Sequence, residues 1–275
     1  LSLHCYLLVF LAICLRTSSV SAQEDLPLKI FTTNRVGMTH SSDLPAAGEL
    51  HCSIGHRFGE IKGGFYNMFG LDLATIRLGF DYGLADRITI GTGRSTWEKT
   101  YDFYLKTGIL EQSENGFPFS ITGLATLSLA TLRNFYPESN SGFTDRSSFS
   151  GQLLLARRQG KVSFQVSPSA FRNNFEVRDN GPLLLFYFPV TTAVRITKRL
   201  AISLQYIPVI NRPSYSSENP LSIGFDIDTG GHQFQLIFSN STGVFEKNLL
   251  TNTEGIWGDG KIYFGFNLNR VFYIK

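Results

Sequence analysis

Charged and amide side chains recur at alternate positions of several segments of the sequence, and alternate residues of a strand share one face. These side chains are Glu49, His51, Arg57, Arg77, Asp81, Asp102, Lys106, Asp226, Asp228 and Gln235. A polar face of this kind can line a passage for polar solutes or form a selectivity constriction. Alternatively, side chains of opposite charge pair across a narrow interior and keep it closed, because side chains largely fill small barrels.

Asp226 and Asp228 form a carboxylate pair two residues apart on one face. That spacing corresponds to roughly 6–7 Å along a strand. The two carboxyl groups of a glycosidase lie about 5–9.5 Å apart and flank the substrate. The spacing permits acid–base catalysis, but it is common by chance. The sequence therefore predicts no catalytic role for this pair.

Histidine and serine residues do not combine into a nucleophilic or metal site. Ser239 lies seven positions after His232, which is over ~20 Å along a strand. A nucleophile and its base need hydrogen-bond contact. His51 and His56 fall on opposite faces of one strand. No cluster of Cys, His, Asp and Glu has zinc or iron spacing. We expect no catalytic residue, metal or cofactor.

The elements that must position these side chains are strands. Apolar and polar residues alternate in segments such as 49–58, 75–82, 100–110 and 262–268. We count about twelve such strands, and no segment of comparable length has a helical period. Several segments reach the roughly 9–11 residues that a tilted strand needs to cross a bilayer.

The connections between these strands mostly alternate between brief and long, with an exception at 95–99, which is short where a long loop is expected. Brief connections span 83–86, 159–160, 197–199 and 229–231, and long polar ones span 59–73, 133–147, 172–182, 211–220 and 239–260. Short turns on one rim and long loops on the other are typical of a transmembrane barrel with periplasmic turns and extracellular loops. The sequence therefore predicts an all-β fold, an up-and-down antiparallel transmembrane β-barrel in which the last strand pairs with the first.

Two features depart from the alternation. Arg270 falls on the apolar side of the last strand, so we expect either a bulge near Asn269 or an arginine at the membrane interface. The segment 183–190 is apolar on both faces. Its inner face is expected to contact a plug or the N-terminal segment.

The N-terminus resembles a secretory signal. An apolar run over 5–15 precedes the small-residue site Val20-Ser21-Ala22, as in a cleaved signal peptide. Lipoprotein processing at Cys14 is the alternative, although Ile13 stands where a small residue is needed. We expect a signal peptide over 1–22, an N-terminal periplasmic segment over 23–47 and a barrel domain over 48–275.

Composition limits the classes of partner. Only 17% of the residues are charged and the net charge is +3, without a Lys/Arg run that could follow a phosphate backbone. We therefore expect no nucleic acid. The expected partners are outer-membrane lipid, with small polar solutes or envelope proteins reached through the long loops. Loops 59–73, 133–147 and 239–260 are the candidates for a plug or a partner surface.

Several motifs resemble an uncharacterised family of bacterial outer-membrane β-barrel proteins of Bacteroidota type. The motifs are "GHRFG" (55–59), "FGLD" (69–72), "RLGFDYGLADRITIGTGRS" (77–95), "KTYD" (99–102), "DIDTGGHQFQLIFSNS" (226–241) and "WGDGKIYFGFNLNRVF" (257–272). The resemblance implies a barrel in the outer membrane of a Gram-negative cell. It implies no reaction, because the family is a domain of unknown function.

We therefore predict a non-enzymatic outer-membrane barrel with a charged polar lumen. It would serve as a narrow channel or transport barrel, or as a structural component of the envelope. One alternative is a membrane-embedded lipid-modifying enzyme, which requires a Ser/His or metal cluster near a rim. The other is a soluble periplasmic β-barrel binding protein, which requires an apolar interior and a polar exterior.

Overall fold

A computed structural model of the chain describes residues 28–114, 116–133, 142–178, 181–212 and 218–274. The predicted signal peptide (1–22), the start of the 23–47 segment and most of loop 133–147 lie outside these residues. In the described part of the chain, no helix has the length and apolar character needed to cross a membrane.

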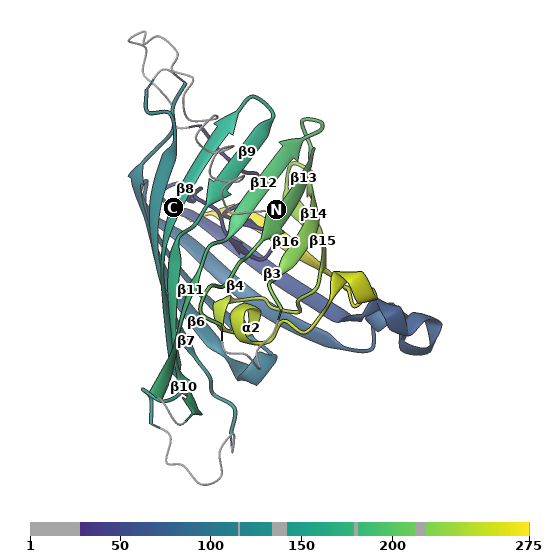
Figure 1. Ribbon diagram of the computed structural model, residues 1–275. Helices are drawn as coiled ribbons and strands as arrows, with labels where there is room; N and C mark the ends of the chain where they lie inside the picture. The colour runs from purple at the N-terminus through teal and green to yellow at the C-terminus, as the bar shows by residue number, and fades with distance from the viewer. Residues whose placement is uncertain (1–27, 115, 134–141, 179–180, 213–217, 275) are drawn as a thin grey trace.

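Strands make up most of the described chain (Figure 1). They are β1 (Arg35–Val36), β2 (Thr39–His40), β3 (Glu49–Glu60), β4 (Ala74–Ala85), β5 (Ile88–Ser95), β6 (Tyr101–Leu110), β7 (Ser120–Leu129), β8 (Ser147–Gln159), β9 (Val162–Val166), β10 (Ser169–Arg178), β11 (Gly181–Tyr187), β12 (Val190–Arg195), β13 (Leu200–Tyr206), β14 (Leu221–Asp228), β15 (His232–Ser239) and β16 (Tyr263–Tyr273). The helical elements are short: η1 (Ile61–Gly70), η2 (Trp97–Lys99), α2 (Glu246–Thr251) and η3 (Trp257–Asp259).

The strands from β3 to β16 form one closed antiparallel barrel of twelve wall strands. β9 and β10 are two halves of one wall strand, since both pair with β8, and β11 continues into β12 in the same way. Pro168 and Pro189 mark the two interruptions. Proline has no N–H to give to the ladder. Their carbonyls still accept bonds from Leu153 N (3.1 Å) and Ser167 N (2.9 Å), so the wall continues across them.

The last wall strand closes the barrel, as the sequence predicts. β16 pairs with β3 from Tyr263↔Glu60 to Tyr273↔Glu49 and with β15 on its other side. Closure satisfies the hydrogen-bonding groups of what would otherwise be two exposed edges. One expected loop is different: most of 172–182 belongs to β10 and β11, so these two strands extend well beyond the predicted boundary.

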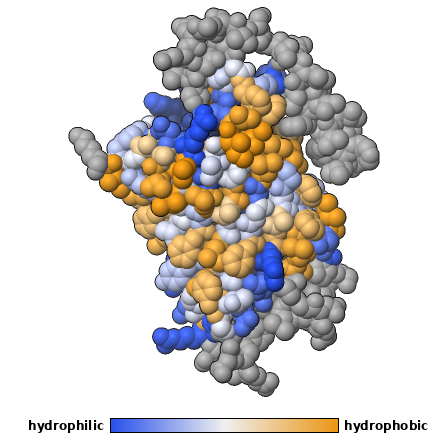
Figure 2. Space-filling view, turned by 90° about the vertical axis from the view of Figure 1, so that its left-hand side faces the viewer, coloured by the Kyte–Doolittle hydropathy of each residue, from blue (hydrophilic) through white to orange (hydrophobic). Residues whose placement is uncertain are grey.

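Apolar residues face outward and polar residues face inward. On β4, Leu78 and Phe80 are 50% and 49% exposed. Arg77 and Asp81, which flank them in the sequence, are 4% and 0% exposed. Figure 2 shows apolar side chains gathered across the middle of one outer face. An apolar belt around a polar interior suits a barrel in lipid. It is the inverse of the apolar interior and polar exterior that the soluble binding protein requires.

Arg270 lies on the outer face of β16, and its guanidinium is 5.0 Å from the ring centroid of Phe272. The pairing of β16 with β15 runs without a register shift through Asn269 and Arg270. The bulge expected near Asn269 is therefore absent from this pairing, and Arg270 lies on the outer face beside the β14–β15 turn, opposite His232. Its position at the membrane interface remains a prediction.

Inward-facing glycines make room for large side chains of neighbouring strands. A Cβ atom at Gly91 of β5 would overlap the ring of the buried Tyr104 on β6. We expect Gly91→Ala to lower the free energy of unfolding by about 1–3 kcal/mol, because the rigid ring must shift. Urea unfolding of the barrel reconstituted in lipid vesicles measures this change. Gly151→Ala is the matched control, since a Cβ there meets nothing within 4 Å. Equal midpoints for the two variants would contradict the packing argument.

Candidate functional site: the occluded lumen

Residues 28–48, which we call the inner segment, enter the barrel from the short-turn rim and return to it. At one end Leu28 N donates to Gln112 O (2.7 Å), and at the other Gly48 N donates to Gly83 O (2.9 Å). Between these ends β1 pairs with β2 around Gly37, whose φ of 60° permits the tight turn. The inner segment is thus a re-entrant hairpin, and its turn lies deep in the lumen.

The segment 23–47 was expected on the periplasmic side of the barrel, whereas its residues 30–42 lie within the barrel. Its residues from Ile30 to Ser42 are almost all buried. A buried peptide group needs a hydrogen-bond partner. Here the side chains of the wall supply many of these partners, so the wall and the inner segment form one polar network.

Three inward-facing glutamines hold the inner segment through its main chain. Gln165 of β9 accepts from Ser42 N (2.8 Å) and donates to His40 O (2.9 Å). Gln205 of β13 accepts from Met38 N (3.0 Å). Gln235 of β15 donates to Arg35 O (3.1 Å). Gln235 is among the lumen residues predicted from the sequence, whereas Gln165 and Gln205 are not. Their signal in the sequence is a glutamine at an inward position of a strand whose outward positions are apolar.

Lys106 of β6 is a fully enclosed charge of this network. Its side chain is 0% exposed. Its Nζ donates to the carbonyls of Asn34 (3.2 Å), Ser41 (2.9 Å) and Asp43 (2.7 Å). Asp81 of β4 faces the same region and accepts from Asn34 Nδ2 (2.6 Å). Both predicted lumen residues therefore bind the inner segment.

A buried ion pair joins two wall strands nearby. Arg77 of β4 donates from Nε to Oδ1 of Asp102 on β6 (2.8 Å) and from Nη2 to the other carboxylate oxygen (2.5 Å). Arg57 of β3 is 2% exposed and bonds two main-chain carbonyls and Asn267 Oδ1 (3.0 Å). Among the described residues, the hydrogen-bond partners of Arg57 include no carboxylate.

The remaining predicted lumen residues divide between the interior and the rim. Asp226 is 3% exposed and accepts from Gln235 Nε2 (2.8 Å). His51 contacts Glu49 (Nε2 to Oε2, 3.1 Å) near the short-turn rim. Asp228 accepts from Gly230 N (2.8 Å) within the β14–β15 turn, so it stabilises that turn. Asp226 and Asp228 thus have different partners and do not flank a common site.

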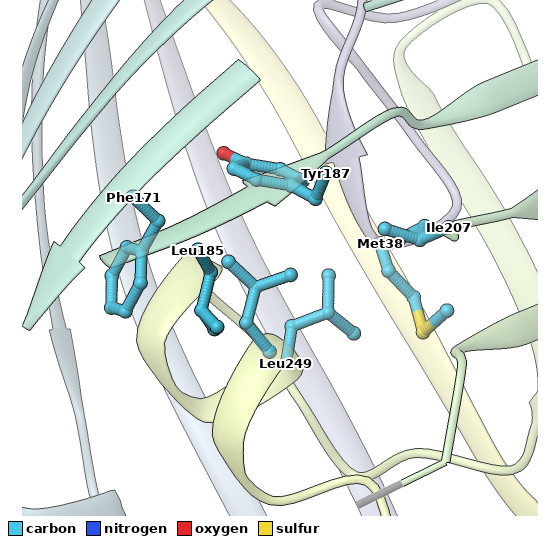
Figure 3. Close-up of a cluster of buried hydrophobic side chains, with 7 residues drawn as sticks. Met38, Phe171, Leu185, Tyr187, Ile207 and Leu249 are labelled. Carbon is cyan, nitrogen blue, oxygen red and sulfur yellow. The ribbon is translucent and has the colours of Figure 1, made fainter. Parts of the chain in front are cut away.

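Loop 240–262 occupies the lumen from the opposite rim. Its helix α2 has five buried residues, and Leu249 and Leu250 are each 1% exposed. They join a cluster of apolar side chains that also come from the barrel wall and from the turn of the inner segment (Figure 3). The cluster consists of Met38, Phe171, Leu185, Tyr187, Ile207, Leu249 and Leu250. Leu185 and Tyr187 belong to the stretch that is apolar on both faces, whose inner face was expected to contact a plug.

Polar contacts fix α2 in place. Glu246 accepts from Gln152 Nε2 of β8 (3.1 Å), and Lys247 Nζ bonds Glu98 Oε2 of the β5–β6 connection (2.6 Å). Burial raises the pKa of Glu98, while Lys247 acts in the opposite direction. Of the three loops proposed as a plug or partner surface, 239–260 is the one whose described residues enter the lumen. Loop 59–73 instead projects outward with Phe65 and Tyr66 exposed.

In the described part of the chain, neither His51 nor His232 forms a side-chain hydrogen bond to a serine, which the lipid-modifying alternative calls for. His232 pairs with the outward-facing Arg270, whereas Ser239 is buried at the other end of β15. Among the described residues, no group of three His, Cys, Asp or Glu side chains is placed to hold a metal ion.

A closed antiparallel barrel with an apolar belt and a filled polar interior defines the class: a membrane β-barrel with an occluded lumen. The chain belongs to the family described as "Membrane bound beta barrel domain (DUF5777)", which it matches over residues 31–272. The comparison with curated proteins found no match.

Among solved structures, a porin shares the barrel architecture. The NanC porin is 10% identical, with a TM-score of 0.53 over 82% of this chain and 100% of its own. OmpT of Vibrio cholerae is 7% identical, with a TM-score of 0.40 over 83% of this chain and 99% of its own. OmpF of Salmonella typhi is 7% identical, with a TM-score of 0.39 over 82% and 97%. At this level of identity the likeness to the NanC porin indicates the fold alone.

Proposed function

We propose that this protein is a narrow outer-membrane channel for small polar solutes, which the inner segment keeps closed until it moves. The observation that carries this proposal is the hairpin inside the lumen. Its main chain is held by side-chain hydrogen bonds to a polar wall. Such a wall remains hydrophilic when the hairpin leaves, and water then replaces the lost partners.

The rim from which the hairpin enters supports the same proposal. A cavity of about 610 Å³ lies there between the inner segment and the wall, and Lys29, Asp43, Glu49, His51 and Arg87 are among its lining residues. It offers a polar solute an entrance and gives the inner segment space to move. Nothing in this proposal requires catalysis.

The location that we propose is the outer membrane of a Gram-negative cell of Bacteroidota type, reached by means of a cleaved signal peptide. The closed barrel supports this location, because cell envelopes of this kind house such barrels. Lipid would surround the belt, and envelope proteins would have access to the exposed loop 59–73. A structural envelope barrel is the second candidate, and the buried apolar contacts of Leu249 and Leu250 favour it.

Conductance in planar bilayers tests the two candidates. We expect the full-length barrel to be silent for most of a recording and a variant without residues 28–44 to open in discrete steps. Heat-modifiable gel mobility shows that each sample is folded. Gln165→Ala with Gln205→Ala, which removes bonds to the inner segment, should raise the open fraction. Thr126→Ala with Ser150→Ala is the control, since these two wall residues bond each other (2.9 Å).

A folded deletion variant that stays silent would contradict the channel. The interior would then remain closed by loop 240–262 and by pairing within the wall, and the structural role would be the better assignment. Discrete steps that also occur at the same frequency in the full-length protein would contradict the plugging role of the inner segment.

A further inference from the structure

A small enclosed cavity of about 20 Å³ lies where the inner segment, the wall and loop 240–262 meet. Arg35 comes from the inner segment, Arg57 and Arg77 come from β3 and β4, and Val244 comes from the loop. About 10–15 Å³ of such volume holds one water-sized particle. The cavity therefore has room for a single atom of that size and excludes phosphate or sulfate.

The lining of this cavity is strongly cationic. Three of its residues are arginines and none is acidic. Only Arg77 has a carboxylate partner, Asp102. Like charges repel strongly where water is scarce. The guanidinium groups of Arg35 and Arg57 thus lack a counter-charge in the lining itself.

Several donors at the cavity also lack a hydrogen-bond partner. They are Nε of Arg57, Nε of Arg35 and the hydroxyl of Ser53. Arg57 is 2% exposed and Ser53 is 8% exposed. A buried donor without a partner is costly, and more so when it carries charge. Asn267 lines the same cavity, and its carbonyl oxygen is already occupied by Arg57.

From these observations we propose that the cavity is a binding site for a monatomic anion, with chloride as the occupant. The anion accepts hydrogen bonds from the guanidinium groups of Arg35 and Arg57 and from the hydroxyl of Ser53. It bridges the inner segment to β3 and so holds the plug in its closed position. This site does not depend on whether the barrel conducts.

The first test is the unfolding temperature of the full-length barrel in detergent, in sodium chloride against sodium gluconate at constant ionic strength. A ligand that binds only the folded state raises stability with the logarithm of its concentration. We expect the midpoint to rise with chloride. Arg35→Gln, which leaves the wall unchanged, and Arg57→Gln should each abolish this rise. Arg94→Gln, at an exposed position of β5, should preserve it.

The second test locates the ion directly. Crystals grown with sodium bromide should give one anomalous peak between Arg35 and Arg57, and sulfate should give no bound group there. The proposal is overturned by equal midpoints in chloride and gluconate, or by a chloride effect that persists in both arginine variants. A crystal in which the cavity contains water and no bromide also overturns it.

Discussion

Replacing Asp102 by Asn should lower the free energy of unfolding by about 3–5 kcal/mol, which is the usual cost of removing one partner of a buried ion pair. Arg77 and Asp102 are 4% exposed each, and two hydrogen bonds connect them. The substitution conserves shape and leaves the Arg77 guanidinium without its counter-charge. Urea titration of the barrel in lipid vesicles measures the loss.

A double substitution separates the ion pair from the fold around it. Arg77→Met with Asp102→Leu removes both charges, and replacing a buried pair by apolar residues is often close to neutral. We expect this variant to be more stable than Asp102→Asn. Because buried pairs are weakly screened by salt, the difference should persist at high ionic strength. If Asp102→Asn unfolds at the wild-type urea concentration, the pair does not stabilise the barrel.

Lys106→Met is expected to have the second large effect. The change removes a fully buried ammonium that donates to the carbonyls of Asn34, Ser41 and Asp43. Each carbonyl left unsatisfied costs about 1–3 kcal/mol. We expect a total loss of about 3–5 kcal/mol, since part of this cost is relieved if the inner segment leaves the lumen and meets water.

Because the inner segment can leave the lumen in the Lys106→Met variant, we expect two effects that Asp102→Asn does not have. The inner segment should become accessible to protease from the short-turn rim, and the open fraction in planar bilayers should rise. Asp102→Asn is the control, because the side chain of Asp102 bonds Arg77 of the wall and no described residue of the inner segment. If residues 28–48 resist protease as well in Lys106→Met as in the wild type, this lysine does not hold the inner segment in the lumen.

The barrel itself is largely encoded by local pattern. The alternation in segments such as 75–82 and 262–268 specifies which side chains face lipid and which face the interior, because side chains of a strand point to alternate faces. From this pattern and the two classes of connection, the number of wall strands, the closure of β16 on β3 and the polar character of the lumen were all predicted, and the structure confirms them. For Arg270 the pattern left two alternatives open, a bulge or an arginine at the membrane interface, and the pairing of β16 with β15 shows no bulge.

What fills the lumen was decided by the tertiary structure. The inner segment lacks a sustained period, and water can satisfy its peptide groups as well as protein can, so its sequence alone does not indicate burial. Only the assembled wall brings Gln205 to Met38, 167 residues away in the chain, and Gln165 to His40, 125 residues away. The same holds for α2, whose six residues give no helical signal until Phe171, Leu185 and Met38 surround Leu249. Strand periodicity is a local property that can be detected in the sequence. The fit of a plug depends on side chains that are distant in the sequence and come together only when the barrel has closed.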